Sequence, residues 1–192
     1  MITIAVIGDI GSGKSHVAKL FGYPVFNADQ EVAKLYRKNK KVYFELKEAF
    51  PGHISTFPIK KLELFKAIFS NKKSLRIISK IVHPKIRLIM GSFIKRNKNK
   101  KIIVLDIPLL LENKLEKKNY ILVYLDSKKK DINKRLKKRP NFNPKIIKQL
   151  KKLQLPLEYK KKKSHFVIKN TFNNNYVKNN VKIIIKKILT NA

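Results

Sequence analysis

The residues most able to do chemistry are GDIGSGKS at positions 8–15, which match the phosphate-binding pattern G-x-x-x-x-G-K-[ST]. Glycines in such a loop let the backbone turn tightly, so that successive N–H groups can point at phosphate oxygens. The Lys14 amine is then expected to reach the β- and γ-phosphates of ATP, and the Ser15 hydroxyl to hold Mg²⁺. The sequence therefore predicts a site for a nucleoside triphosphate and its metal ion near the start of the chain.

We expect the backbone of this loop, and of the helix that follows it, to contribute most of the phosphate contacts, because a helix N-terminus carries a partial positive charge. The residues predicted to contact ATP in this way are Gly8, Gly11, Ser12, Gly13, Lys14, Ser15 and His16. For His16 the backbone N–H is sufficient, so the side chain is not constrained. Asp9 is unusual in an anion-binding loop, and we expect its side chain to point outward or toward a cation.

A carboxylate follows the second expected strand, in the segment VFNADQ at 25–30. In a parallel sheet the carboxyl ends of neighbouring strands share one crevice, which would bring Asp29 beside the phosphates. There Asp29 could accept a proton from an attacking hydroxyl. Asp29 could equally cap a helix that begins at Gln30, and these residues alone leave both interpretations open.

The hydrophobic pattern predicts the elements that must position these groups. Continuous or short apolar runs indicate strands at 2–7, 23–26, 102–107, 120–125 and 165–169. Helices are expected at 14–21, 128–138, 144–152 and 176–189, and a largely helical stretch at 29–99 is broken by turn residues at 51–58. Strands that alternate with helices indicate an α/β fold with a doubly wound sheet.

Composition limits the class of protein. Lys and Arg number 46 against 12 Asp and Glu, which gives a net charge of +34. Such a charge can attract polyanions, but we find no RNA-binding signature or helix-turn-helix spacing, and we favour a bias toward Lys, Asn and Ile over a specific nucleic-acid partner. Cys is absent, which excludes disulfides and thiolate zinc sites. No apolar run is long enough to span a membrane, and the first residues do not resemble a signal peptide, so we expect a cytoplasmic protein.

Six segments resemble, in order and at similar spacings, the dephospho-coenzyme A kinases, which catalyse the last step of coenzyme A biosynthesis. The segments are GDIGSGKS (8–15), NAD (27–29), VHP (82–84), DIPLLLE (106–112), RLKKR (135–139) and QLPLEYKKKKSHFVIKN (154–170). Each is weak alone, but the ordered set is specific. The resemblance implies an α/β, P-loop NTPase-type three-layer fold with a parallel five-stranded sheet, a helical substrate-binding insertion and a lid.

The resemblance also implies roles for individual residues. It makes Asp29 the base for the ribose 3′-hydroxyl of dephospho-coenzyme A, together with Lys14 and Arg139 as catalytic groups, Arg139 closing over the transferring phosphate from the lid. It places His83 and Pro84 at the acceptor pocket and Asn170 near the base of the nucleotide. Asp106 ends an apolar strand, where its carboxylate is expected to organise Mg²⁺ or its waters beside the substrate.

We therefore predict a P-loop kinase that uses ATP and Mg²⁺, acts on dephospho-coenzyme A, and is a monomer or weak homo-oligomer. Its core is expected at 1–54 and 99–192, its helical substrate subdomain at about 55–98 and its lid at about 136–145. The nearest alternative is another small-molecule or nucleotide kinase of the same architecture. A second alternative is a polyanion-binding protein that keeps a degenerate P-loop. The sequence departs from the family pattern at Asp9, Asn27 and Lys169.

Overall fold

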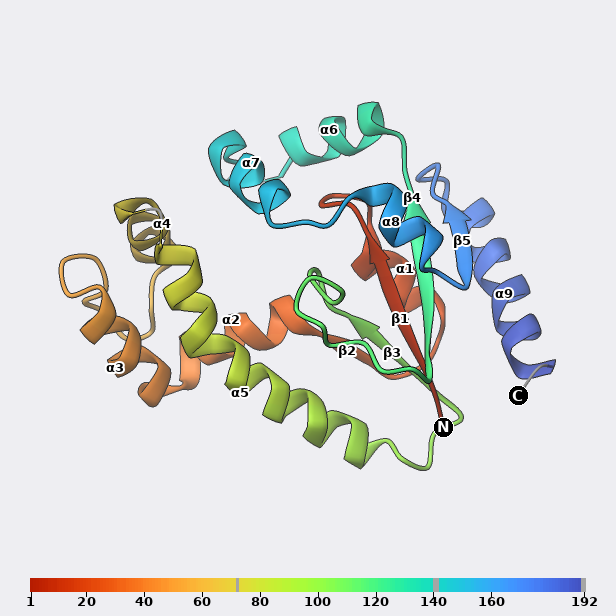
Figure 1. Ribbon diagram of the computed structural model, residues 1–192, viewed down its shortest axis with the longest axis horizontal. Helices are drawn as coiled ribbons and strands as arrows, with labels where there is room; N and C mark the ends of the chain where they lie inside the picture. Colours follow the sequence, from red (N-terminus) through yellow and green to blue (C-terminus); the bar gives the residue numbers. More distant parts are fainter. Residues whose placement is uncertain (72, 140–141, 191–192) are drawn as a thin grey trace. The chain divides into compact units, whose positions relative to one another are not determined.

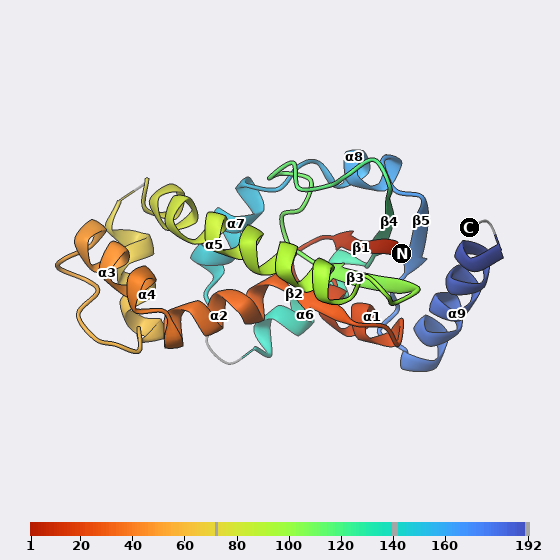
Figure 2. The ribbon, with the colours of Figure 1, turned by 90° about the horizontal axis from the view of Figure 1, so that it is seen from below.

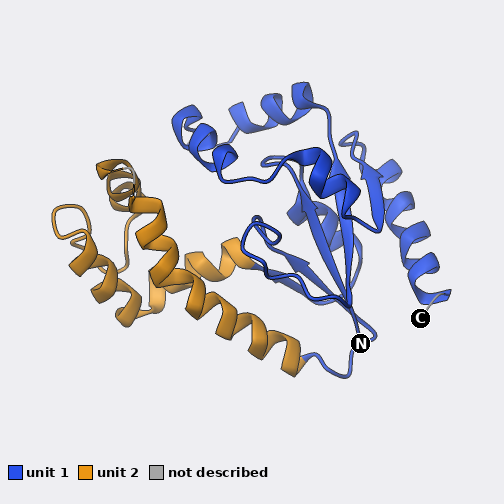
Figure 3. Cartoon of the chain, in the orientation of Figure 1, with its two compact units in different colours: residues 1–27, 97–192 blue, residues 28–96 orange. Residues whose placement is uncertain are grey.

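The computed structural model describes residues 1–71, 73–139 and 142–190 (Figure 1). The chain divides into two compact units, one made of Met1–Asn27 with Asn97–Ala192 and the other of Ala28–Arg96 (Figure 3). The phosphate-loop motif belongs to the first unit, whereas Asp29 belongs to the second.

The first unit is built on a five-stranded sheet in which every pairing is parallel, as predicted. Its order is β2-β3-β1-β4-β5. The strands are β1 (Ile2–Gly8), β2 (Val25–Asn27), β3 (Ile102–Asp106), β4 (Tyr120–Asp126) and β5 (Phe166–Lys169). In this register Val6 pairs with Asp106, and Gly8 pairs with Leu125. The central strand β1 therefore leads into its loop between the carboxyl ends of β3 and β4.

Helices cover both faces of this sheet, which explains why the central strands are apolar along their whole length. The helices that contact the strands are α1 (Lys14–Leu20), α8 (Leu157–Lys162) and α9 (Asn174–Thr190). α6 (Lys129–Lys137) and α7 (Pro144–Lys152) lie beyond the carboxyl ends of the strands (Figure 1). Val17 of α1 and Val181 of α9 are fully buried in one core with Ile4 and Val6 of β1. Figures 1 and 2 show α8 on the opposite face from α1.

The second unit consists of helices gathered around α5 (Ser74–Arg96). α2 (Ala28–Lys38), α3 (Lys40–Ala49) and α4 (Lys61–Ser70) all contact α5, and Glu45 of α3 pairs with Lys85 of α5 at 2.6 Å. Because α2 and α3 pack with α5, the compact unit begins at Ala28, well before the boundary near residue 55 expected from the sequence. Among the described helices, none combines the length and apolar character needed to cross a membrane.

Candidate active site

The loop between β1 and α1 requires glycine at two positions for reasons of space as well as of backbone angle. Gly11 has a φ of 85°, and a Cβ there would lie 2.9 Å from Cγ of Leu136. Gly13 has a φ of 92°, and a Cβ there would lie 3.0 Å from Nδ2 of Asn170. Residues with a side chain rarely adopt these backbone angles. The turn of the loop and its contacts with α6 and with Asn170, just after β5, therefore both favour glycine.

The loop holds polar groups that can form hydrogen bonds with the phosphates of a nucleotide. The buried Lys14 amine donates to the carbonyl oxygens of Asp9 at 2.7 Å and Gly8 at 3.3 Å. The Ser12 hydroxyl oxygen is buried and has no hydrogen-bond partner within the described parts of the chain. The His16 N–H donates to the Gly13 carbonyl at 3.0 Å. Tight glycine turns, an amine and a spare hydroxyl fit the binding of phosphate oxygens.

Asp106 joins this loop from the end of β3. Its carboxylate accepts hydrogen bonds from the Ser15 hydroxyl and from the Asn27 side-chain amide. Burial raises the pKa of Asp106, although the Ser15 hydrogen bond, the charge of Lys14 and the Asn27 amide all act in the opposite direction. The structure thus brings together Lys14, Ser15 and Asp106, three of the residues singled out in the sequence. A hydroxyl beside a carboxylate is a pair of oxygen donors of the kind that Mg²⁺ prefers.

The raised pKa of Asp106 predicts opposite effects of Asp106→Asn on stability and on turnover. As pH rises, the unfolded chain loses this proton before the folded chain does, so the ionised carboxyl lowers the free energy of unfolding. We expect the Tm of Asp106→Asn, relative to wild type, to rise in magnesium-free buffer as the pH increases above about 4, the ordinary pKa of an aspartate side chain. Turnover with Mg·ATP should fall in the same variant. A Tm difference that does not change with pH would contradict this assignment.

Asn170 ties the segment after β5 to the phosphate loop. Its amide nitrogen donates to the Ser12 carbonyl at 2.7 Å, and its amide oxygen accepts from the Phe172 N–H at 2.9 Å. Nearby, the His16 ring lies 3.0 Å from the side-chain oxygen of Asn174. Both polar atoms of the Asn170 side chain therefore hold the protein backbone, which positions the loop; its contact with a nucleotide base stays a prediction.

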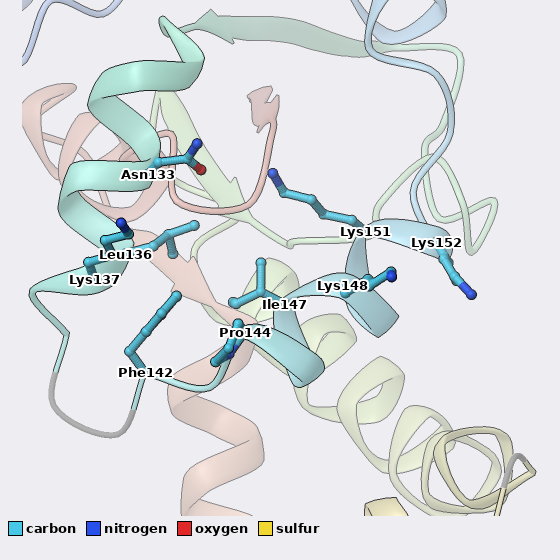
Figure 4. A pocket seen from close by; sticks show the side chains of 9 residues that line it. All are labelled: Asn133, Leu136, Lys137, Phe142, Pro144, Ile147, Lys148, Lys151 and Lys152. Atoms are coloured by element: carbon cyan, nitrogen blue, oxygen red, sulfur yellow. The ribbon is translucent and has the colours of Figure 1, made fainter.

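The region expected to form the lid contains a groove of about 570 Å³ between α6 and α7 (Figure 4). Its lining combines four apolar side chains, one asparagine and four lysines: Leu136, Phe142, Pro144, Ile147, Asn133, Lys137, Lys148, Lys151 and Lys152. Arg139 is exposed just beyond α6, whereas the Arg135 guanidinium lies 4.7 Å from the centre of the Phe172 ring. Of the predicted lid at 136–145, residues 140 and 141 lie outside the described residues.

The remaining predicted residues belong to the helical unit. α2 begins at Ala28, so Asp29 lies inside its first turn and is exposed, instead of capping a helix that begins at Gln30. His83 and Pro84 lie in the middle of α5. Burial, with a further contribution from the charge of Arg87, lowers the pKa of His83, which favours the neutral imidazole. Contacts of these residues with an acceptor stay predictions.

Three residues that the sequence analysis gave no site role form a buried polar cluster beside the loop. Lys160 is only 1% exposed, and its amine lies 2.5 Å from the Glu112 carboxylate. Gln154 stands between Lys160 and Asp9. Because an unpaired buried amine is costly, the pairing accounts for an acid in DIPLLLE and a lysine in QLPLEYK. Lys160 is the first of four consecutive lysines, so no signal in the sequence distinguishes it from its more exposed neighbours.

Comparison with known proteins agrees with this geometry. The family model for dephospho-CoA kinase (CoaE) matches residues 2–175. A dephospho-CoA kinase of Bartonella quintana is 33% identical over 173 residues, which cover 88% of each chain. A crystal structure from Thermus thermophilus superposes with a TM-score of 0.77 at 28% identity, covering 97% of both chains. A dephospho-CoA kinase from Campylobacter jejuni gives a TM-score of 0.63 at 25% identity, covering 97% of this chain and 96% of that one. The chain therefore belongs to the dephospho-CoA kinase family.

Proposed function

We propose that this chain transfers the γ-phosphoryl group of Mg·ATP to the ribose 3′-hydroxyl of dephospho-coenzyme A. The observation that carries the proposal is the gathering of Lys14, Ser15 and Asp106 around the glycine loop, in a member of this kinase family. A kinase needs a phosphate cradle, a cation and oxygen ligands for a metal at one place, and these residues supply all three.

In this mechanism the protein positions and neutralises, and it forms no covalent bond with the phosphoryl group. When bound, Mg²⁺ would supply positive charge that offsets the negative charge developing on the phosphates during transfer. Ser15 and Asp106 would hold that ion, and the Lys14 amine would leave the Asp9 carbonyl for the phosphate oxygens. The loop's N–H groups would bind the phosphates as fixed donors in a site shielded from water.

Asp29 and Arg139 complete the proposed chemistry. The 3′-oxygen forms a bond to the γ-phosphorus while the bond from that phosphorus to the β-phosphate oxygen breaks, and ADP leaves. The proton of the 3′-hydroxyl passes to the Asp29 carboxylate, which follows the end of β2 by two residues. Arg139, exposed beyond α6, would approach the transferring group and neutralise its charge. His83 and Pro84 would shape the acceptor pocket.

The proposed partner is a small molecule, and we propose a monomer or weak homo-oligomer in the cytoplasm that needs no specific nucleic acid. The net charge of +34 can cause nonspecific binding to nucleic acid, which weakens steeply as the salt concentration rises. Varying the salt concentration therefore distinguishes nonspecific from specific binding.

The direct test is incubation of the purified protein with Mg·ATP and dephospho-coenzyme A, with product identified by mass. We expect coenzyme A and ADP to form in equal amounts. A panel of other acceptors, including nucleoside monophosphates and sugars, should release ADP far more slowly. Preferred turnover of one of those acceptors would replace the proposed substrate. Nucleic-acid binding that persists near physiological salt, without phosphoryl transfer to any acceptor, would point to the polyanion-binding alternative.

A further inference from the structure

The acid in the phosphate loop is turned toward the polypeptide between α7 and α8. The Asp9 side chain is only 9% exposed, and its Oδ1 accepts a hydrogen bond from the N–H of Ile10 at 2.6 Å. The Gln154 amide lies against the same oxygen. Oriented so that its nitrogen faces this carboxylate and its oxygen faces an amine, Gln154 donates to Asp9 Oδ1 at 2.8 Å and accepts from Lys160 at 3.1 Å.

The other carboxylate oxygen of Asp9 faces a cation from α7. The amine of Lys151 lies 3.9 Å from Asp9 Oδ2. In Figure 4, Lys151 extends toward the phosphate loop, whereas Lys148 and Lys152 of the same helix direct their amines away from it. Lys151 is 40% exposed, so its amine is accessible from solvent while it lies beside the loop.

Apart from Lys14 and Asp106, which face each other at the phosphate site, the charges of this cluster balance when Lys151 is counted. Lys160 and Glu112 form a buried pair of opposite charges, and Gln154 joins them to Asp9 without adding charge. Asp9 therefore leaves one negative charge beside the phosphate site, and Lys151 matches it. A buried carboxylate that lacks a compensating cation is strongly disfavoured. The position of Lys151 on α7, beside the loop, therefore stabilises the Asp9 carboxylate.

From these contacts we propose that Asp9 is a positioning residue that holds Lys151 beside the phosphate loop, where Lys151 serves as an additional cation for the phosphates of ATP. The inference deepens the proposed function and rests on it for the identity of the nucleotide. Asp9 is the residue that departs from the family pattern in this loop, and Lys151 is the residue through which it acts. The buried pair of Lys160 and Glu112 fixes the segment that follows α7.

A simpler role for Asp9 predicts the opposite change in ATP affinity when this residue is replaced. If its carboxylate only repelled the phosphates, Asp9→Asn would tighten ATP binding. If it positions Lys151, Asp9→Asn should weaken ATP binding, because the lysine loses its partner at the loop. The dissociation constant for Mg·ATP, measured by calorimetry without any acceptor, separates these two outcomes. That measurement remains informative even if dephospho-coenzyme A proves not to be the substrate.

We expect Lys151→Met to raise the Kd for Mg·ATP about tenfold, as is typical of losing a hydrogen bond to a charged group. Asp9→Asn should raise it about threefold, the scale of a partly exposed ion pair. Lys152→Met is the matched control, since it removes the same charge from the neighbouring position on α7, and it should leave the Kd nearly unchanged. Lys151→Arg should restore most of the lost affinity. Thermal unfolding checks that each variant keeps its fold.

The double variant tests the coupling between the two residues. If Asp9 acts through Lys151, adding Asp9→Asn to Lys151→Met should cost no further affinity, whereas independent effects would multiply. Tighter ATP binding by Asp9→Asn would overturn the proposal, and so would equal losses from Lys151→Met and Lys152→Met. Failure of the proposed function would give a different result from these two outcomes. The variants would then show the expected Kd values for Mg·ATP, but the protein would form no coenzyme A.

Discussion

Replacement of Lys14 by alanine is expected to lower kcat/KM by at least ~10²-fold while the fold is retained. The Lys14 amine is buried at the loop, where it donates to the carbonyl of Asp9 at 2.7 Å and lies close enough to Asp106 to influence its pKa. In a site of low dielectric constant a fixed positive charge stabilises a phosphoryl transition state far more than it would in water. Steady-state kinetics with Mg·ATP and dephospho-coenzyme A measure the loss.

The matched control for Lys14 is Lys19→Ala, which removes an exposed lysine from the last turn of the same helix α1. It should retain nearly wild-type kinetics and Tm. Equal effects of the two substitutions would show that net charge, and not the position of the Lys14 amine, supports activity. Near-normal turnover in Lys14→Ala would contradict the assignment of this lysine to the phosphates.

Asp29→Asn is expected to reduce kcat by ~10²–10⁴-fold, the range associated with loss of a general base. Asparagine has nearly the same shape but cannot accept the proton of the 3′-hydroxyl at neutral pH. KM for ATP should change little, since the proposed role of Asp29 concerns the acceptor. Presteady-state measurement of a single turnover would show whether the loss lies in phosphoryl transfer.

A helix-stabilising role for Asp29 is tested in the same experiment. Asp29 and Glu31 both lie in the first turn of α2, where acids interact favourably with the helix dipole by ~0.3–1 kcal/mol. Glu31→Gln is therefore the control: it removes the same charge from the same turn and should slightly lower Tm without a large change in kcat. Loss of activity in both variants, in proportion to loss of stability, would assign Asp29 to the helix alone.

The fold was predictable where the hydrophobic pattern of a segment agrees with its burial in the folded chain. β1 and β3 are buried on both faces, and their uninterrupted apolar runs indicated strands almost to the residue. β2 has three residues, so its pattern is weak, and it was expected slightly too early in the chain. α8 was missed because its six residues are mostly charged, and a helix this short depends on packing against β1 and β4.

The site was predictable where its residues form a continuous motif or end a buried strand. The glycine loop, Lys14 and Ser15 form a continuous motif, and Asp106 was found because it ends a buried strand. The cluster around Asp9 could not be predicted from the sequence. Gln154 and Lys160 follow Asp9 by roughly 150 residues, and they lie near it only in the folded chain. The start of the helical unit at Ala28 likewise depends on packing of α2 and α3 against α5.

The most direct test of this account is a crystal structure with a nonhydrolysable ATP analogue, Mg²⁺ and dephospho-coenzyme A. We expect N–H groups of residues 8–16 to bind the phosphates, and the Asp29 carboxylate to lie about 3 Å from the ribose 3′-oxygen, within hydrogen-bond distance. An Asp29 side chain directed away from that oxygen, too far for even a bridging water molecule, would contradict the proposed mechanism.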